Sequence, residues 1–307
     1  MPLMRLWGRF GPIPAFMAVL AALALSAPLR VSAQPGNPPG TQAAKPPAAG
    51  AGNSDASLAF APALRVRIGP DGNACGISIP APRPSGAGRN AKRPLIVWLH
   101  GGMRSRNPEK GFEAHRALTR FVGPSDYYLC SPSAFLDQEW TRPQGIAHVD
   151  ALIDYVVSKY PVDAEDITLV GVSDGCLGVI AYCMQGKREI RRRVLISSAP
   201  QLVIPLENLA GQAGFAKGTW DFFQGGQDRL FPSEQVVPYL REWERLYPNA
   251  HLHFYPEGEH DFSFYAEHAA EALRSVFSPG KPKVSGPGGA QGKVQKSQTA
   301  PKPQAGN

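Results

Sequence analysis

Hydrophobic and polar positions show two periodicities along the middle of the chain, one typical of strands and one typical of helices. Short apolar or alternating runs predict strands at 64–68, 76–79, 94–99, 126–130, 167–172, 193–197, 219–223 and 252–255. Helical spacing predicts helices at 147–159, 175–184, 233–246 and 262–277, with Ser233 as the N-cap of the third. Strands that alternate with helices predict an α/β fold, a mostly parallel sheet of about eight strands with helices on both faces.

The two ends of the chain have a different character. Residues 1–33 combine early arginines, an apolar stretch at 13–27 and small residues before position 34, which predicts a secretory signal peptide cleaved after Ala33. A retained membrane anchor is the alternative, but prolines bracket a run that is short for a span. Residues 34–57 are rich in Pro, Ala and Gly, and residues 279–307 in Lys, Pro and Gly. Both predict disordered segments around a domain at 58–278.

The excess positive charge lies at the two ends of the chain and not in the predicted domain. The 307 residues carry a formal net charge of +7, to which residues 1–33 contribute three arginines and residues 279–307 five lysines. The domain at 58–278 is therefore nearly neutral, and no nucleic-acid partner is expected. The tail is expected either to touch an anionic cell envelope loosely or simply to solubilise the chain. With the signal peptide removed, we expect an exported protein, periplasmic or extracellular, without a transmembrane segment.

The strongest chemical signal is Gly171-Val172-Ser173-Asp174-Gly175, which lies between a strongly apolar predicted strand and a helix. In that context G-x-S-x-G forms a tight turn that exposes a strained serine hydroxyl. Side chains at Gly171 and Gly175 would collide with the backbone of such a turn. We therefore predict that Ser173 is a nucleophile; the alternative is a structural serine in a tight turn.

A serine nucleophile needs a base, and in this arrangement an acid and then a histidine follow the serine along the chain. Asp228 follows the strand at 219–223, and His260 follows the strand at 252–255. We predict that His260 takes the proton of Ser173 and that Asp228 orients the imidazole. Glu259 is the rival acid. Other acidic and histidine residues are less suitable, because they lie in predicted strands or helices, adjoin His260 or precede Ser173. They are Asp221, Asp261, His115, His148, His251, His253 and His268.

When a serine attacks a substrate carbonyl, a negative charge develops on the carbonyl oxygen, and two N–H donors are needed to stabilise it. The N–H of Asp174 lies at a predicted helix start, where the helix dipole favours negative charge. His100-Gly101-Gly102-Met103 follows the strand at 94–99, and we assign the second donor to Gly102, with Met103 as the alternative. His100 is expected to be a hydrogen-bonded structural residue. The carboxylate of Asp174 is expected to disfavour anionic substrates.

Taken together, the segments 100–102, 171–175, 225–228 and 258–262 resemble those of the α/β-hydrolase superfamily, over residues 60–278. Residues 159–163, Lys-Tyr-Pro-Val-Asp, are similar to the segment before the nucleophile in polyhydroxybutyrate-depolymerase-like and feruloyl-esterase-like enzymes. The chain also resembles the phospholipase/carboxylesterase and dienelactone-hydrolase branches. The resemblance implies a Ser–Asp–His triad and no cofactor. Residues 200–217 are too few for a large lid domain, which favours small or polymer-end esters.

Cysteine spacing gives a weaker prediction. Cys176 and Cys183 are about 10 Å apart along one predicted helix, too far to bridge each other. In the usual strand order of the superfamily, Cys75 and Cys130 lie on neighbouring strands and are the best candidates for a disulfide, with four free thiols as the alternative. No spacing typical of metal ligands occurs, and no metal is expected.

Three functions fit this sequence. We favour an exported serine hydrolase that cleaves small-molecule or polymeric carboxylic esters through an acyl-enzyme. The alternatives are a serine peptidase on the same fold and a catalytically silent binding protein at the cell envelope. Phe135 and Trp140 are expected either to line an acyl pocket or to belong to the core.

Overall fold

The computed structural model describes residues 63–69, 72–80, 91–102, 105–119, 126–134 and 139–277. Contacts divide the chain into two units, Met1–Ser54 and Asp55–Asn307. The first unit lies outside the described residues. Outside the described residues also lie the segments predicted as signal peptide, linker and tail, at 1–33, 34–57 and 279–307.

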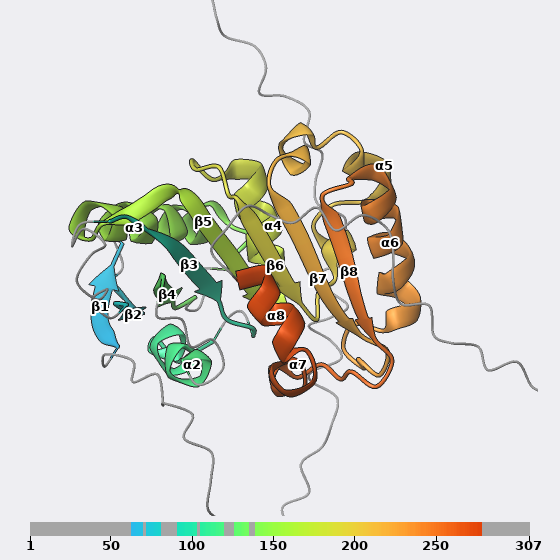
Figure 1. Ribbon diagram of the computed structural model, residues 1–307, viewed down its shortest axis with the longest axis horizontal. Coiled ribbons are helices and arrows are strands. Elements are labelled where there is room, and N and C mark those ends of the chain that lie inside the picture. Colours follow the sequence, from blue (N-terminus) through green and yellow to red (C-terminus); the bar gives the residue numbers. More distant parts are fainter. Residues whose placement is uncertain are drawn as a thin grey trace, which may run out of the picture. The chain divides into compact units, whose positions relative to one another are not determined.

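Eight strands form one sheet in the order β1-β2-β4-β3-β5-β6-β7-β8 (Figure 1). The pairs β1–β2 and β2–β4 are antiparallel, and the other five pairs are parallel. The strands are β1 (Leu64–Ile68), β2 (Asn73–Ser78), β3 (Arg93–Leu99), β4 (Tyr128–Pro132), β5 (Val162–Val172), β6 (Arg192–Ile196), β7 (Thr219–Gly225) and β8 (Ala250–Tyr255). The predicted, mostly parallel sheet is confirmed.

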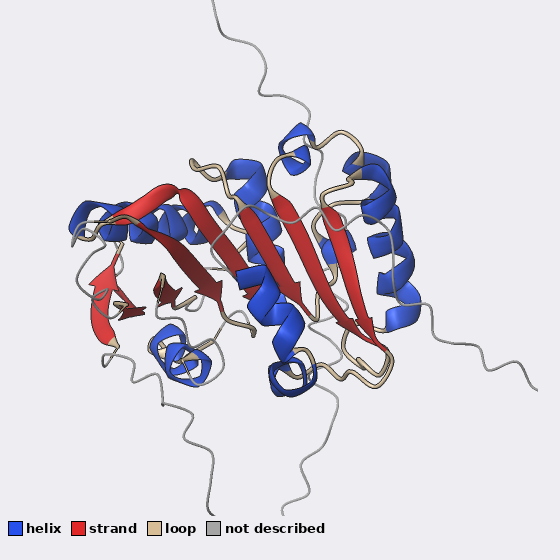
Figure 2. Cartoon of the chain, in the orientation of Figure 1, coloured by secondary structure: helices blue, strands red, loops and turns tan. Residues whose placement is uncertain are grey.

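Helices cover both faces of this sheet (Figure 2). One face carries α3 (Pro143–Lys159), α4 (Asp174–Gln185) and α6 (Ser233–Leu246), and the other carries α2 (Lys110–Leu118), α7 (Phe262–His268) and α8 (Ala270–Phe277). Alternate side chains of each strand point to opposite faces. In β3, Leu95, Val97 and Leu99 join the first core, whereas Ile96 and Trp98 join the second. The apolar run at 94–99 thus belongs to a strand buried on both faces.

The structure differs from the predicted helices at two places. Helix α2 was not predicted, because its buried positions are Gly111, His115 and Leu118, which give little apolar periodicity. The single helix expected at 262–277 is broken at Ala269, where α7 ends and α8 begins one residue later. In the described residues, no helix is long and apolar enough to cross a bilayer.

The predicted N-cap of α6 is also wrong. Pro232 takes the N-cap position, with φ −54° and ψ 131°. Proline suits this place because its fixed φ matches the entry to a helix and no N–H is needed there. The hydroxyl of Ser233 instead donates to the carbonyl of Gly226 at 3.3 Å. Ser233 thereby ties the start of α6 to the turn that follows β7.

The four cysteines are free thiols, so the predicted disulfide between Cys75 and Cys130 is wrong. Their strands do pair, but the register sets Cys75 opposite Pro132 and Ile77 opposite Cys130. The two cysteines are diagonal neighbours, at about 7 Å, whereas the Cβ atoms of a disulfide are about 4 Å apart. Burial raises the pKa of Cys75 to about 12 and the pKa of Cys130 well above its ordinary value, so both stay protonated.

The segment between β6 and β7 is fastened to α6. Tyr239 donates to the carbonyl of Ile204, and Tyr247 donates to the carbonyl of Leu209, both at 2.7 Å. The segment consists of short helical turns: η1 (Pro200–Leu202), α5 (Leu206–Leu209) and η2 (Ala213–Ala216). As predicted, no large lid domain is inserted at this point of the described chain.

Candidate active site

Ser173 occupies the sharp turn between β5 and α4. Its backbone has φ 53° and ψ −122°, a conformation that costs a non-glycine residue energy. The turn leaves no space for side chains on either side. A Cβ atom at Gly171 would lie 2.5 Å from the backbone nitrogen of Cys176, and one at Gly175 would lie 2.0 Å from the carbonyl oxygen of Leu99. The two glycines of the motif are thus explained by close backbone approach.

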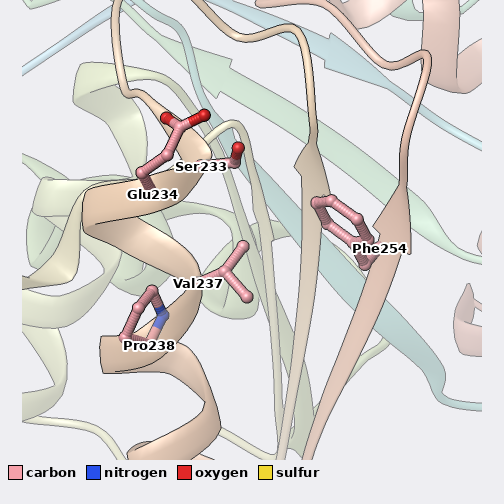
Figure 3. Close-up of a pocket in the computed structure, with 5 residues that line it drawn as sticks. All are labelled: Ser233, Glu234, Val237, Pro238 and Phe254. Atoms are coloured by element: carbon pink, nitrogen blue, oxygen red, sulfur yellow. The ribbon is translucent and has the colours of Figure 1, made fainter.

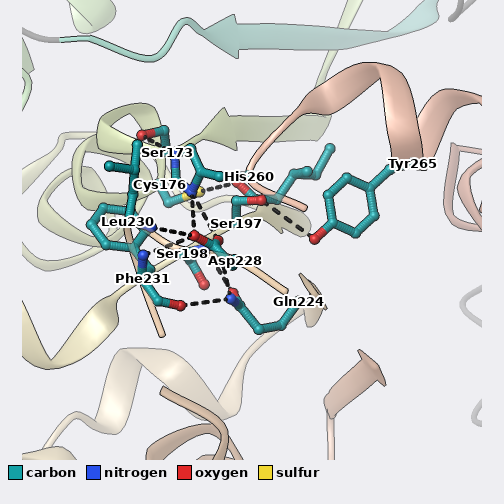
Figure 4. A network of polar contacts seen from close by, with 11 residues as sticks. Ser173, Cys176, Ser197, Ser198, Gln224, Asp228, Leu230, Phe231, His260 and Tyr265 are labelled. Carbon is teal, nitrogen blue, oxygen red and sulfur yellow. Dashed lines mark hydrogen bonds and ion pairs between the residues drawn. The ribbon is translucent and has the colours of Figure 1, made fainter. Parts of the chain in front are cut away.

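His260 joins Ser173 to Asp228 (Figure 4). Its Nε2 lies 2.9 Å from Ser173 Oγ, and its Nδ1 lies 2.9 and 2.8 Å from the two carboxylate oxygens of Asp228. Because an ionised carboxylate can only accept, Nδ1 carries the proton and Nε2 is free to accept from the serine hydroxyl. The three predicted residues therefore meet in the geometry of a nucleophile, a base and an orienting acid.

The carboxylate of Asp228 is buried and held by the backbone. Its Oδ1 accepts hydrogen bonds from the N–H groups of Leu230 at 3.0 Å and Phe231 at 2.8 Å. Burial alone would raise the pKa of Asp228, but the bonds from His260, Phe231 and Leu230 outweigh it and lower the pKa below its ordinary value. Asp228 therefore stays ionised at neutral pH, as a carboxylate that orients a histidine must.

The loops that carry Asp228 and His260 are packed glycine against glycine. A Cβ atom at Gly225 would lie 2.1 Å from the carbonyl oxygen of Gly258. The N–H of Gly226 donates to Tyr255, and the N–H of Gln227 donates to Gly258, both at 2.8 Å. The turns after β7 and β8 are thus locked together, which sets the distance between the acid and the histidine.

The loop after β3 lies beside the serine, as its predicted role requires. A Cβ atom at Gly101 would be 3.1 Å from Ser173 Cβ, and Gly102 has φ 69°. His100 accepts from the N–H of Ala134 through Nε2 at 3.0 Å, so its Nδ1 carries the proton and donates to the carbonyl of Gly101 at 2.9 Å. That carbonyl belongs to the peptide that carries the N–H of Gly102, whose direction is therefore fixed.

His100 has the structural place expected of it. Burial lowers the pKa of His100 to about 4, so the ring stays neutral. Trp140 is fully buried and donates from Nε1 to the carbonyl of His100 at 3.0 Å, which makes it a core residue that supports this loop. Met103 and Phe135 lie outside the described residues.

Lys110 adds a positive charge beside the site. Its Nζ donates to the carbonyl of Gly102 at 2.9 Å. Burial lowers the pKa of Lys110 below its ordinary value, while the nearby carboxylate of Asp174 acts in the opposite direction. The half-buried Asp174, whose N–H begins α4, therefore does not stand as a lone negative charge at the serine.

The rejected candidates lie elsewhere. Glu259 is exposed, and it is Asp228 that meets His260. Asp261 caps α7 by accepting from the N–H of Ser263 at 3.0 Å, and Asp221 pairs with His253 at 3.0 Å. Of the other histidines, two are buried, one is half-buried and one is exposed: His115, His148, His251 and His268.

A shallow hollow of about 250 Å³ lies between α6 and β8, and it is not lined by Ser173, Asp228 or His260 (Figure 3). It is lined by Ser233, Glu234, Val237, Pro238 and Phe254. Within the described ranges, no group of three or more His, Cys, Asp or Glu side chains is placed to hold a metal ion.

Sequence reasoning missed three residues around Ser173, Asp228 and His260. Gln224 contacts Asp228, Lys110 contacts the loop after β3, and the ring of Phe231 packs edge-on against His260 at 5.0 Å. Gln224 and Phe231 flank Asp228 in the sequence, so their position was a usable signal. Lys110 begins a helix that the sequence did not predict, and nothing in its pattern marked it.

No family model and no curated protein matches this sequence. Solved structures do match. They include a thermostable esterase (TM-score 0.53, 16% identity, covering 71% of this chain and 62% of that chain). S-formylglutathione hydrolase (FrmB) from Staphylococcus aureus has TM-score 0.54 and 15% identity, over 71% of this chain and 98% of that one. A ferulic acid esterase has TM-score 0.51 and 16% identity, over 66% and 91%.

The chain thus spans less than two thirds of the length of the thermostable esterase. At these identities the likeness shows the fold alone. This chain has the α/β-hydrolase fold. The order of strands in the sheet, the strained serine between β5 and α4 and the structural neighbours all indicate that fold.

Proposed function

We propose that this chain is a serine hydrolase that cleaves carboxylic esters through an acyl-enzyme. The observation that carries the proposal is the pair of contacts made by His260, 2.9 Å to Ser173 Oγ and 2.8 Å to Asp228 Oδ2. A hydroxyl is a weak nucleophile at neutral pH and becomes effective when an oriented base takes its proton as it attacks. The strained turn presents that hydroxyl at the carboxyl end of β5, where ligands of open α/β sheets bind.

In the first half of the reaction, Ser173 Oγ attacks the ester carbonyl and its proton passes to His260 Nε2. Asp228 stabilises the imidazolium that forms. The N–H groups of Asp174 and Gly102 donate to the negative oxygen of the tetrahedral intermediate. The intermediate collapses, the bond to the alcohol breaks, and His260 returns the proton to the departing oxygen. The acyl group remains on Ser173.

In the second half, water attacks the acyl carbon and gives its proton to His260. The second tetrahedral intermediate uses the same two N–H donors, and its collapse releases the carboxylic acid and returns the proton to Ser173. No cofactor takes part in any step of the proposed reaction.

Esters are proposed as substrates because two of the structural neighbours named above, with TM-scores above 0.5, are esterases. The segment between β6 and β7 is tied to α6 by Tyr239 and Tyr247, which supports small esters or polymer ends over aggregated lipid. A polyhydroxybutyrate-like polyester is one candidate polymer, supported by the sequence resemblance around Lys159.

Export to the periplasm or the medium is part of the proposal. It is supported by the charge, the apolar stretch and the small residues of the first 33 positions. N-terminal sequencing of the protein recovered outside the cytoplasm tests it, and a chain that retains Met1 would contradict it. Binding of the chain with and without residues 279–307 to anionic vesicles tests the envelope contact of the tail.

The catalytic proposal is tested with a fluorophosphonate probe and with p-nitrophenyl acetate and butyrate. Labelling and ester turnover should disappear in Ser173→Ala and persist in Ser233→Ala, whose hydroxyl bonds the turn after β7 without contacting the triad. A folded wild-type protein that neither labels nor turns over would overturn the proposal in favour of a silent binding protein. Faster turnover of an acyl-amino acid p-nitroanilide than of both esters would favour the peptidase.

A further inference from the structure

Gln224 occupies the carboxyl end of β7, with its side chain fully buried. Its amide makes three hydrogen bonds (Figure 4). Oε1 accepts from the N–H of Ser198 at 3.1 Å. Nε2 donates to Asp228 Oδ2 at 3.3 Å and to the carbonyl of Phe231 at 3.2 Å. Both N–H groups and the oxygen of the amide are therefore engaged, which is what a buried amide requires.

One of these hydrogen bonds goes to Asp228 Oδ2, whereas the backbone donors hold the other carboxylate oxygen. Oδ1 is fixed by the N–H groups of Leu230 and Phe231. Oδ2 receives His260 and Gln224. Of these two donors, His260 gains and loses a positive charge during the proposed reaction. The amide of Gln224 stays neutral, so its hydrogen bond to Asp228 does not change. Gln224 therefore provides the fixed donor that resists rotation of the carboxylate about its Cβ–Cγ bond.

The other end of the amide is anchored to a strained segment after β6. Ser197 has φ 53°, its N–H donates to Phe223 at 2.9 Å, and its hydroxyl lies 3.4 Å from the hydroxyl of Tyr265. The next N–H, that of Ser198, is the one that Gln224 accepts. Gln224 thus connects the carboxyl ends of β6 and β7 with the loop that carries the acid.

We propose that Gln224 is a positioning residue, which fixes the carboxylate of Asp228 so that His260 is held in line with Ser173. The proposal rests on the proposed function, because it assigns Gln224 a part in that same reaction. A residue that holds the acid affects the chemical step more than substrate binding, since Gln224 lies behind Asp228 and is closed to solvent.

The test compares Gln224→Met, which has a similar length and no donor, with wild type on p-nitrophenyl acetate. The kcat per active site, counted by fluorophosphonate labelling of Ser173, should fall about 10- to 100-fold with KM within about twofold, since small misplacements of catalytic groups have effects of this size. The matched control is Asn249→Ala, which removes an amide that donates to two carbonyls, those of Phe215 at 2.9 Å and Gly218 at 2.7 Å, at the other end of β7. It should lower the melting temperature and leave kcat per active site within about twofold.

Gln224→Glu is the second variant, in case Gln224→Met does not fold. It keeps an acceptor for the N–H of Ser198 and, once ionised, places a like charge against Asp228. Its kcat at pH 9 should also fall below wild type. A wild-type kcat in either folded variant would overturn the inference while Ser173-dependent turnover stands. Absence of turnover in the wild type would overturn the proposed function itself.

Discussion

The contact between Gly225 and Gly258 predicts the effect of adding one methyl group. Gly225→Ala would place a Cβ atom 2.1 Å from the carbonyl oxygen of Gly258 and 2.4 Å from its carbonyl carbon. Real Cβ atoms essentially never come within 3.0 Å of another heavy atom in such positions. Both neighbouring atoms are backbone, so no side chain can swing away. One of the two turns must move by about 1 Å, a shift of the size known to disturb catalysis.

That shift separates Asp228 from His260, because Gly225 precedes the acid by three residues and Gly258 precedes the histidine by two. A misplacement of about 1 Å lowers kcat/KM about 100-fold, equal to about 2.7 kcal/mol in transition-state energy. Overpacking of this kind also costs about 1–3 kcal/mol of the free energy of unfolding. We expect both losses in Gly225→Ala.

The assay is ester hydrolysis at a temperature well below the melting transition, with unfolding followed in urea. Gly211→Ala is the matched control, since a Cβ atom there would meet the carbonyl of Asn208 at 3.6 Å, an ordinary contact. Gly211→Ala should retain activity and stability. If Gly225→Ala folded with wild-type kcat/KM and an unchanged urea midpoint, the argument that this contact sets the distance between acid and base would be refuted.

The role of Asp228, the burial of His115 and the state of the cysteines can each be measured. Asp228→Asn should lower kcat by about 10³- to 10⁴-fold with the fold intact, because a neutral amide does not hold the tautomer that His260 needs; a loss under tenfold would contradict the role of Asp228. Burial lowers the pKa of His115 to about 4, below its ordinary 6.5, so the unfolded chain binds a proton first as pH falls. His115 should therefore account for a loss of up to about 3 kcal/mol in the free energy of unfolding between pH 6.5 and 4, and urea titrations should show that His115→Leu loses correspondingly less than wild type over that range. Thiol titration in denaturant without reductant should count four cysteines, whereas two would show a disulfide.

Much of the fold was predictable because apolar periodicity and burial coincide. In the parallel strands β3 and β5, residues 95–99 and 167–171 are buried on both faces, so these segments are nearly continuous apolar runs. The bounds were less predictable. Strand β5 begins at Val162 and not at 167: the buried Val162 pairs with Arg93, and the register shifts before Ile167 pairs with Leu95. The mostly polar residues 163–166 lie in this irregular part and interrupt the apolar run on which the predicted bound rested.

The site was predictable where backbone chemistry demanded particular residues. Gly171 and Gly175 mark the turn around Ser173, and the chain order of acid and histidine follows from the strand order. The residues that support Ser173, His260 and Asp228 were harder to predict. The position of Gln224 shortly before Asp228 was a usable signal, but a polar residue near the end of a strand interrupts the apolar pattern, which does not indicate that its side chain is fully buried. The disulfide between Cys75 and Cys130 was wrongly predicted because strand adjacency does not give the register.

The two edges of the sheet differ in how open they are to further pairing. On one edge, β1 carries Arg65 and Arg67, and both guanidinium groups pair with Glu109. Charges of this kind discourage a second strand from docking. On the other edge, β8 contains no Lys, Arg, Asp or Glu, and Phe254 is 39% exposed. In concentrated solution, self-association of the described domain should therefore begin along β8, and that strand is where a solubilising charge would be introduced.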